Sequence, residues 1–289
     1  MHDSPYSGRQ HPSARFAVIL GTNEIASAVA VNLYRSGYSL VLSHDPLPPV
    51  IRRKMAFHDV LYDDPVTIAG VTAERVDTGL EILSRFARPR GVIITELGLL
   101  DLIVVRTLDI LVDARMQKYQ VTPDLRRLAR FTIGLGPGFS AGTNCDSAIE
   151  TRPSRAGRII QQGSTDPADG LSRRLGNRGA ERFVYAAFPG RWHTAIDIGT
   201  RIYKDFIVGH LGGTAVRAPF DGILRGVVRD GTEVPAAVKL LEVDPRGRRA
   251  NWTGIDSRAK TIANAVTKAV SIHAATAPVQ VRRVLSVVK

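Results

Sequence analysis

The sequence has one cysteine among its 289 residues, few aromatic side chains (6%) and no long apolar run. One cysteine excludes an intramolecular disulfide and is typical of a reducing compartment, so we expect a cytoplasmic protein. No run approaches the roughly 20 apolar residues that span a bilayer, so we expect no membrane partner. Residues 1–15 lack the apolar core of a secretory signal and are expected to form a disordered leader. The seven histidines are dispersed, and none lies at metal-ligand spacing from the cysteine, so we predict no metal site.

Positive charge exceeds negative charge by 12, with 39 lysines and arginines against 27 acidic residues. Such an excess can indicate a nucleic acid or an acidic partner. The basic residues are mostly arginines and are scattered along the chain, and no long basic run is interleaved with aromatic residues. A nucleic-acid footprint usually has that interleaving. The sequence therefore predicts no nucleic-acid partner, and an arginine-rich composition accounts for the charge.

The amino-terminal half has the pattern of an α/β fold. Residues 16–20 form a short apolar run that ends at Gly21, as a buried parallel strand does. Apolar residues at one-turn spacing over 25–33 predict a helix that Gly37 would close, and another apolar run follows. A strand, helix and strand in this order open the nucleotide-binding folds. We therefore predict a Rossmann-like parallel sheet within residues 16–175.

The dinucleotide fingerprint of this fold is incomplete. Its three glycine positions fall on Gly21, Asn23 and Ala26. Asparagine prevents the close approach of a pyrophosphate that glycine allows. Two interpretations stay open: Gly21, Thr22 and Asn23 form a modified cofactor-binding turn, or the unit binds no dinucleotide.

An acid and two bases follow the strand predicted at residues 110–113. Asp113 lies at the carboxyl end of that strand, where open α/β sheets bind ligands. Arg115 and Lys118 come just after it, so the three side chains are candidates for binding a phosphate or a carboxylate. The alternative is a solvated loop with a local ion pair.

Four glycines lie within nine residues at the centre of the chain, directly before the cysteine; they are Gly134, Gly136, Gly138 and Gly142. Many backbone N–H groups at an expected helix start form an anion site, and we predict one here. Cys145 would lie near the helix start, where a thiol has a lowered pKa and becomes a nucleophile or a sulfur ligand. Cys145 is therefore the candidate catalytic residue. The alternative is that it is a small buried apolar side chain.

The carboxyl-terminal half contains an internal repeat. Residues 184–190 align with 216–222, and residues 199–202 align with 231–234, at a constant offset of 32. Each copy has the pattern of short strands joined by glycine turns. One copy is too small to fold alone, so the two are expected to close one β core within residues 176–250.

The repeat resembles the barrel-sandwich hybrid of lipoyl and biotinyl carrier modules. The resemblance rests on the phrase at residues 217–222 and the turn at 228–234. Such carriers display a modifiable lysine between their halves, but the joint at 212–215 has none, so we expect a docking or gating element. A helix from about Ser257, with a short tail, completes the chain over residues 251–289.

Several segments together resemble the selenium-dependent molybdenum hydroxylase maturation (accessory) family, which is related to the xanthine dehydrogenase accessory proteins. They are residues 46–53, 111–116, 133–139 and 243–247, within a resemblance that covers about 16–270. The resemblance implies a role in maturing a molybdenum-cofactor enzyme, with the molybdenum cofactor or a nucleotide as ligand. It also implies the apoenzyme of the hydroxylase as partner.

The chain departs from that family at two places. The family's opening glycine motif is replaced by the turn from Gly21 to Ser27. The Arg-Gly-His that the family tends to carry after Glu150 is replaced by a stretch without histidine.

The first hypothesis is an accessory protein that binds an anionic cofactor or nucleotide at the central glycine loop, with Arg115 and Lys118 meeting the anion. The second is an NAD(P)-dependent oxidoreductase that uses the first βαβ unit. The third is a structural adaptor without a ligand. The sequence leaves open whether the chain catalyses a reaction and whether it forms a homo-oligomer.

Overall fold

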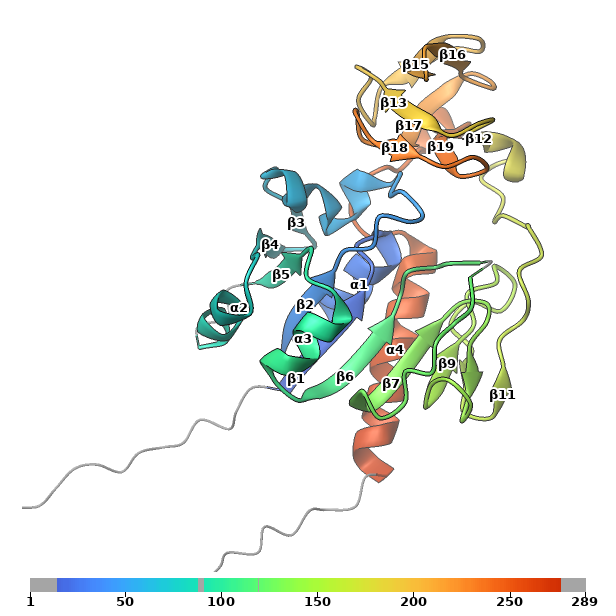
Figure 1. The fold of residues 1–289 in the computed structure, drawn as a ribbon. Helices are drawn as coiled ribbons and strands as arrows, with labels where there is room; N and C mark the ends of the chain where they lie inside the picture. Colours follow the sequence, from blue (N-terminus) through green and yellow to red (C-terminus); the bar gives the residue numbers. More distant parts are fainter. Residues whose placement is uncertain (1–14, 88–90, 119, 277–289) are drawn as a thin grey trace, which may run out of the picture.

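A computed structural model describes residues 15–87, 91–118 and 120–276 of the chain. All but the last residue of the expected leader, and the tail from 277, lie outside these residues. An α/β body carries a separate β module at one end (Figure 1).

The body is built on one nine-stranded sheet. Its strands, in spatial order, are β10 (Ile159–Ile160), β9 (Ser147–Ile149), β7 (Ala129–Leu135), β6 (Leu108–Asp113), β1 (Arg15–Leu20), β2 (Tyr38–Ser43), β5 (Val92–Thr95), β4 (Val71–Arg75) and β3 (Thr67–Ile68). Neighbouring strands from β9 to β4 pair in parallel, and the two outermost strands pair antiparallel. The carboxyl ends of the parallel strands therefore meet at one edge of the sheet.

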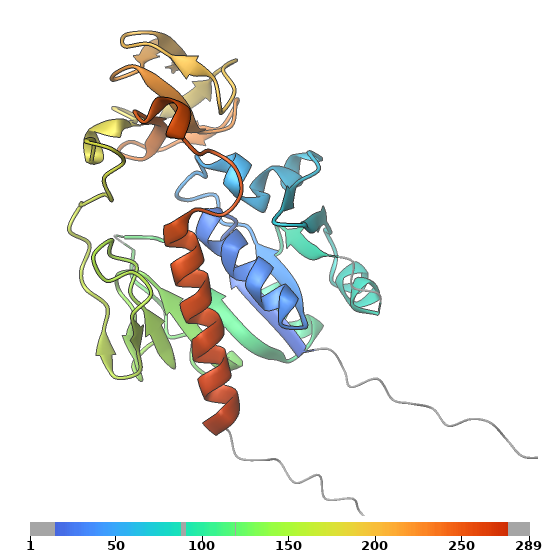
Figure 2. The same ribbon diagram turned by 180° about the vertical axis from the view of Figure 1, so that it is seen from behind.

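Helices cover both faces of this sheet because its strands are apolar on both sides. On β1, Ala17 and Ile19 pack toward α1 (Glu24–Arg35) and α4 (Ser257–Thr276). These two helices lie side by side on one face (Figure 2). Phe16 and Val18 on the same strand pack toward α2 (Gly79–Phe86) and α3 (Leu99–Val105) on the other face. The helix α4 begins at Ser257, as the apolar spacing predicts.

The β module consists of two four-stranded antiparallel sheets. The first has the order β12 (Phe183–Tyr185), β19 (Lys239–Asp244), β17 (Gly222–Val227) and β14 (Arg201–Ile202). The second has the order β16 (Thr214–Arg217), β15 (Ile207–Leu211), β13 (Gly190–His193) and β18 (Glu233–Val234). Both sheets contribute to one core around the fully buried Trp192.

The repeat with an offset of 32 is visible in this arrangement. The strands β13, β14 and β15 begin at residues 190, 201 and 207, and β17, β18 and β19 begin at 222, 233 and 239. Each sheet takes two strands from each copy, and exchanging the copies converts one strand order into the other.

The predicted fold class, a Rossmann-like parallel sheet followed by a lipoyl- or biotinyl-like barrel-sandwich module, is wrong. The structure is a mixed α/β chain with one large, parallel-dominated sheet and several antiparallel sheets. Antiparallel strands close both edges of the large sheet, and no described residue between β6 and β9 forms a crossover helix. The carrier resemblance rests on the short motifs at residues 217–222 and 228–234, which specify local turns. The architecture is decided by the pairing of strands that are distant in the sequence.

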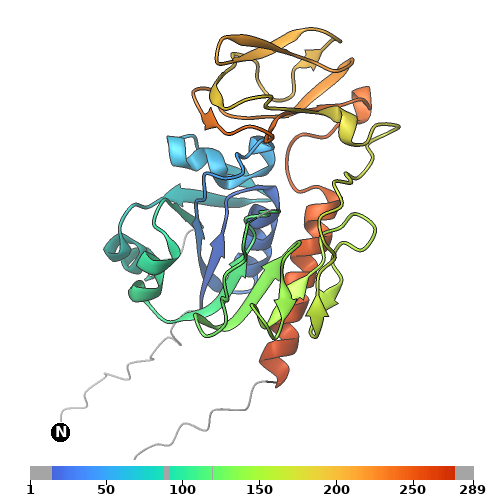
Figure 3. The same cartoon turned by 45° about the vertical axis from the view of Figure 1, so that its right-hand side comes forward.

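The module joins the body through three segments. The chain enters it from the stretch before η3 (Ala180–Arg182) and returns through η4 (Gly247–Arg249) to α4, as Figure 3 shows. The third contact is made by the stretch after β2, where the Val227 N–H donates to the Ile51 carbonyl at 2.8 Å. A Cβ at Gly226 would lie only 2.9 Å from the same carbonyl oxygen, so glycine allows this close approach. The remaining short elements are η1 (Arg53–Met55), η2 (Phe57–Tyr62), β8 (Ser140–Ala141) and β11 (Gly163–Ser164).

Gly134→Ala should destabilise the body. A Cβ at residue 134 would overlap the ring of Phe139, which packs directly over the glycine. Overpacking of this kind costs about 1–3 kcal/mol, measurable as a lower urea midpoint. The matched control is Gly190→Ala. The nearest atom to its Cβ would be the backbone nitrogen of Gly212 at 3.6 Å, an ordinary van der Waals contact. Equal midpoints for the two variants would contradict the expectation.

Candidate functional site

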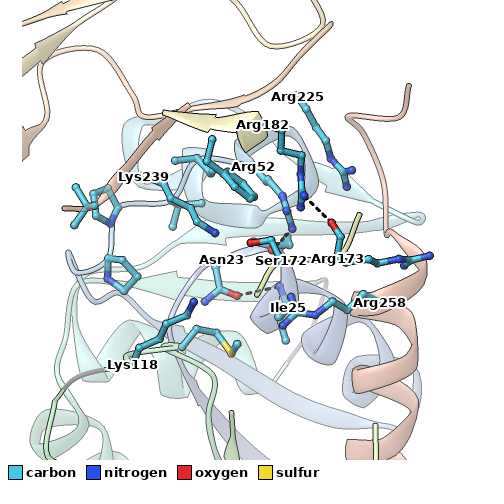
Figure 4. A pocket seen from close by; sticks show the side chains of 18 of the residues that line it. Asn23, Ile25, Arg52, Lys118, Ser172, Arg173, Arg182, Arg225, Lys239 and Arg258 are labelled. Carbon is cyan, nitrogen blue, oxygen red and sulfur yellow. Dashed lines mark hydrogen bonds and ion pairs between the residues drawn. The ribbon is translucent and has the colours of Figure 1, made fainter. Parts of the chain in front are cut away.

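A cavity of about 770 Å³ lies between the carboxyl edge of the large sheet and the β module (Figure 4). The body contributes the first turn of α1, the stretch after β2, the β6–β7 loop and the first turn of α4. The module contributes β12 and β19. Because side chains from both parts form its walls, the cavity exists only when the module is docked on the body.

The walls of this cavity carry a strong excess of positive charge. Nine cationic side chains line it: Arg52, Arg115, Lys118, Arg173, Arg182, Arg225, Lys239, Arg246 and Arg258. Among the described residues, two carboxylates line it, Glu24 and Asp256. Such a concave cluster of one sign attracts an anionic ligand.

A buried ion cluster fixes one wall of the cavity. The fully buried Glu242 accepts from Arg52 Nε at 2.6 Å and from Arg182 Nε at 2.8 Å, and Arg225 Nε lies 4.0 Å away. Arg52 also reaches Glu24 at 2.8 Å. Burial alone would raise the pKa of Glu242, but the three guanidinium groups, Arg52 foremost, lower it to about 2. The carboxylate is therefore ionised and ties the module strand β19 to the body.

Lys239, the first residue of β19, has an unusual environment. Its Nζ lies 3.7 Å from the centre of the Phe183 ring. Burial, together with the charges of Arg52 and Lys118, lowers the pKa of Lys239 to about 8, against the opposing effect of nearby carboxylates. Near neutral pH the ammonium form of Lys239 predominates. This ammonium group forms no ion pair with a carboxylate in the described part of the chain.

Two arginines at the other end of the cavity also lack an ion pair with any described carboxylate. Arg173 donates to the Ser257 hydroxyl at 2.6 Å, and Arg258 donates to the Thr151 carbonyl at 2.9 Å. Both guanidinium groups keep donors free for a ligand, since each has five N–H groups.

Apolar side chains line the rest of the cavity: Leu47, Pro48, Pro49, Val50, Ile51, Met116, Leu171, Leu175, Phe183, Val238 and Ile255. A cavity with both cationic groups and an apolar wall suits an anionic molecule with an organic body.

The predicted turn at Gly21, Thr22 and Asn23 lies at the start of α1, where the Gly21 N–H donates to the Ser43 carbonyl at 2.8 Å. Asn23 Oδ1 caps the helix by accepting from the N–H groups of Ile25 and Ala26, and its Nδ2 donates to Ala114. Thr22 is buried and contacts His58 Nδ1 at 2.9 Å. Of the three residues only Asn23 lines the cavity.

The predicted trio of Asp113, Arg115 and Lys118 is divided by the structure. Asp113 is buried and forms a bidentate ion pair with Arg115, with Nη2 to Oδ2 at 2.6 Å. Arg115 also reaches Asp45 at 3.5 Å. Asp113 and Arg115 therefore form the local ion pair that was the alternative interpretation of the sequence. Lys118 lines the cavity and forms no ion pair with a described carboxylate.

The central glycine loop does not line the cavity, and its predicted role as the anion site needs correction. The N–H groups of Gly136 and Gly142 donate to the carbonyls of Ile149 and Cys145. Gly136 and Gly138 have positive φ, as Gly142 does, and serve tight turns, while Gly134 makes room for Phe139. Carbonyl groups of the protein therefore occupy two of the backbone donors that the sequence offered to an anion.

Cys145 precedes the strand β9 and not a helix, because the expected helix start is absent. The thiol is fully buried, and burial raises its pKa to about 12. A protonated, inaccessible thiol cannot attack or ligate. The structure thus agrees with the alternative that Cys145 is an apolar core residue.

Sequence reasoning missed most of the charged residues of the site, notably Arg52 and Arg258 from the body and Arg182, Lys239 and Glu242 from the module. The one local signal was a glutamate at a core position of an apolar strand, Leu240-Leu241-Glu242-Val243. A charge within such a run needs a buried partner. Its partners lie 60 and 190 residues away in the sequence, and spacing alone could not reveal them.

The comparisons with known proteins give one relative in sequence. No family model matches the chain. The uncharacterized protein YqeB of Escherichia coli (strain K12) is 30% identical over 269 residues, which make up 90% of this chain and 48% of YqeB. The chain thus spans about half the length of the curated relative that it matches.

Solved structures give only weak similarity. An aspartoacylase family protein from Mesorhizobium loti is 11% identical with a TM-score of 0.24, over 81% of this chain and 86% of that one. The apo ectoine utilization protein EutE from Ruegeria pomeroyi has the same identity and TM-score, over 81% and 87%. A succinylglutamate desuccinylase from Silicibacter is 10% identical with a TM-score of 0.20, over 80% and 87%. Scores this low carry no argument about the fold or the function of the chain.

None of the helices in residues 15–87, 91–118 and 120–276 has both the length and the apolarity to cross a membrane. The same residues hold no group of three or more histidine, cysteine or acidic side chains placed to bind a metal ion.

Glu242→Gln should strongly destabilise the chain, because it leaves Arg52 and Arg182 buried without their shared carboxylate. Breaking a buried ion pair in this way costs about 3–5 kcal/mol. The folded-state pKa of about 2 lies below the ordinary 4.5, so the stabilisation is present above about pH 4.5 and is lost as the pH falls toward 2. Urea unfolding at several pH values measures both effects.

The matched control is Glu233→Gln, which removes an exposed carboxylate paired with Arg191 on the same module. An exposed pair contributes about 0–1 kcal/mol. A loss for Glu242→Gln no larger than that of this control would refute the structural role of the cluster.

Proposed function

We propose that this chain binds an anionic small molecule with an apolar body in the cavity between its body and its β module. We further propose that it serves as an accessory protein in the maturation of a molybdenum-cofactor hydroxylase. The observation that carries the first part is the cavity with nine cationic and two acidic side chains. The second part rests on the family resemblance of the sequence, with the molybdenum cofactor or a nucleotide as candidate ligand and the apoenzyme as partner.

The uneven pairing of the cavity's cations supports the proposal that the cavity binds a ligand. Glu242, Asp113 and Asp244 neutralise several of the guanidinium groups from behind. Lys118, Lys239 and Arg258 also line the cavity and form no ion pair with a described carboxylate, although Glu24 and Asp256 act on Arg258 from a greater distance. Cations gathered around one cavity repel one another, and a bound anion relieves that repulsion.

The two other hypotheses have less support. The NAD(P)-dependent oxidoreductase needs free amides at the start of α1 for a pyrophosphate, but the Asn23 side chain caps Ile25 and Ala26. An adaptor without a ligand would have no use for a cationic cavity of this size. We propose no chemical reaction for the chain.

The binding proposal is tested by what co-purifies with the protein. The chain is expressed in its own host, purified and denatured, and the released small molecules are identified by mass spectrometry. We expect an anionic organic compound at near-stoichiometric amount. The double variant Arg173→Gln, Arg258→Gln should lose it, whereas the control Arg191→Gln, an exposed side chain of β13 away from the cavity, should keep it.

The maturation proposal is tested by deleting the gene. We expect the molybdenum hydroxylase of the host to accumulate without activity, and pulldown of the tagged chain to recover its apoenzyme. Wild type and Arg191→Gln should restore activity, while the cavity double variant should not. Full hydroxylase activity in the deletion strain would remove this proposal while leaving ligand binding intact.

A further inference from the structure

We propose that Lys118 and Lys239 form a clamp for a phosphate-class, doubly charged group of the ligand, one lysine from each part of the chain. This inference rests on the proposed function, because it specifies one end of the molecule that the cavity would hold.

The geometry of the two lysines carries the inference. Lys118 belongs to the β6–β7 loop of the body, and Lys239 begins β19 of the module. Figure 4 shows their side chains reaching into the cavity from opposite walls, toward one another. Their charges are close enough for Lys118 to contribute to the lowered pKa of Lys239. Two ammonium groups that face each other across a cavity repel, and an anion bound between them relieves that repulsion.

The nature of the two groups favours phosphate over carboxylate. Lysine ammonium groups bind phosphate as point charges, whereas the bidentate fork of arginine matches carboxylates and phosphates alike, so the preference here rests on the two positive charges that face the ligand. The guanidinium groups of Arg52 and Arg115 are already engaged with protein carboxylates. A phosphate monoester brings close to two charges and three acceptor oxygens, enough for both lysines.

The rest of the cavity leaves room for the remainder of such a ligand. Arg173 and Arg258 lie at the end of the cavity away from the two lysines (Figure 4). Phe183 and Met116 contribute apolar wall to the same cavity. The phosphate would therefore be terminal, with an apolar body beside it and a second polar group toward the arginines.

The probe for this inference is phenyl phosphate, with benzoate as the matched singly charged probe. Binding of both is followed through the aromatic proton signals by saturation-transfer NMR. We expect phenyl phosphate to bind more tightly than benzoate. Lys118→Gln and Lys239→Gln should each weaken it by about tenfold or more, the loss of one charge-assisted hydrogen bond. The control Lys268→Gln removes an exposed charge from α4 outside the cavity and should have no effect.

The pH dependence gives a second measurement. Arg52, Lys118, Glu24 and Glu242 act on Lys239 from the surrounding elements, and Tyr185 lies opposite it on β12. Because the pKa of Lys239 is about 8 in the free protein, wild-type affinity should fall as the pH rises through 8. Phenyl phosphate stays doubly charged in that range, since the second pKa of a phosphate monoester is roughly 6. Lys239→Gln should lose most of this dependence.

The outcomes separate this inference from the proposed function. Unchanged phenyl phosphate affinity in both lysine variants would overturn the clamp. Benzoate binding as tightly as phenyl phosphate would overturn the choice of phosphate. If neither probe binds while an anionic compound still co-purifies with the chain, the clamp is wrong and the proposed function stands. Circular dichroism melting of each variant establishes that a lost signal reflects binding and not unfolding.

Discussion

The ionised carboxylate of Glu242 is the interaction on which the site depends. It lies fully buried on a strand of the module and is held by Arg52 from the body and Arg182 from η3 of the module. Charges in such a place are stable only in pairs, so the module cannot leave the body without exposing or orphaning them. The wall of the cavity that β19 forms is held in place by this constraint.

The same cluster explains why the cavity keeps an excess of positive charge. One carboxylate is shared among three guanidinium groups, and Asp256 supplies the second partner of Arg225 at 3.0 Å. The carboxylate that neutralises these arginines is therefore buried beneath the wall of the cavity that they form. The lysines and arginines at its two ends face an open volume, and this is where a ligand can complete the charge balance.

Local patterns in the sequence predicted local structure well. The apolar run 16–20, the helix after Asn23 and the stripe of α4 lie where their periodicity places them, because each is decided by residues a few positions apart. The 32-residue repeat of the module could be recognised in the sequence, but the order in which its strands pair could not be predicted from it. Which strands pair is decided by contacts between distant residues, and a turn phrase such as Ala218-Pro219 carries no information about them.

The candidate site shows the same limit more sharply. Lys118 was singled out by its place after a strand and does line the cavity, whereas its counterpart Lys239 comes from a strand 121 residues later. The glycines at 134–142 drew attention as a ligand loop, but their backbone serves tight turns and the packing of Phe139. Glycine density indicates unusual backbone, and only the surrounding structure tells whether a ligand or a side chain is the reason.

The placement of α4 has a consequence for the order in which the chain can mature on the ribosome. This helix covers the sheet beside α1, yet it is synthesised only after the whole module. Until then the apolar surface around Ile19 and Val29 is not covered by α4. The strands of the first copy of the repeat likewise cannot pair fully until those of the second copy have been made. Both halves of the molecule are thus completed by late-made segments, which makes the nascent chain a natural client for chaperones that shield exposed apolar surface.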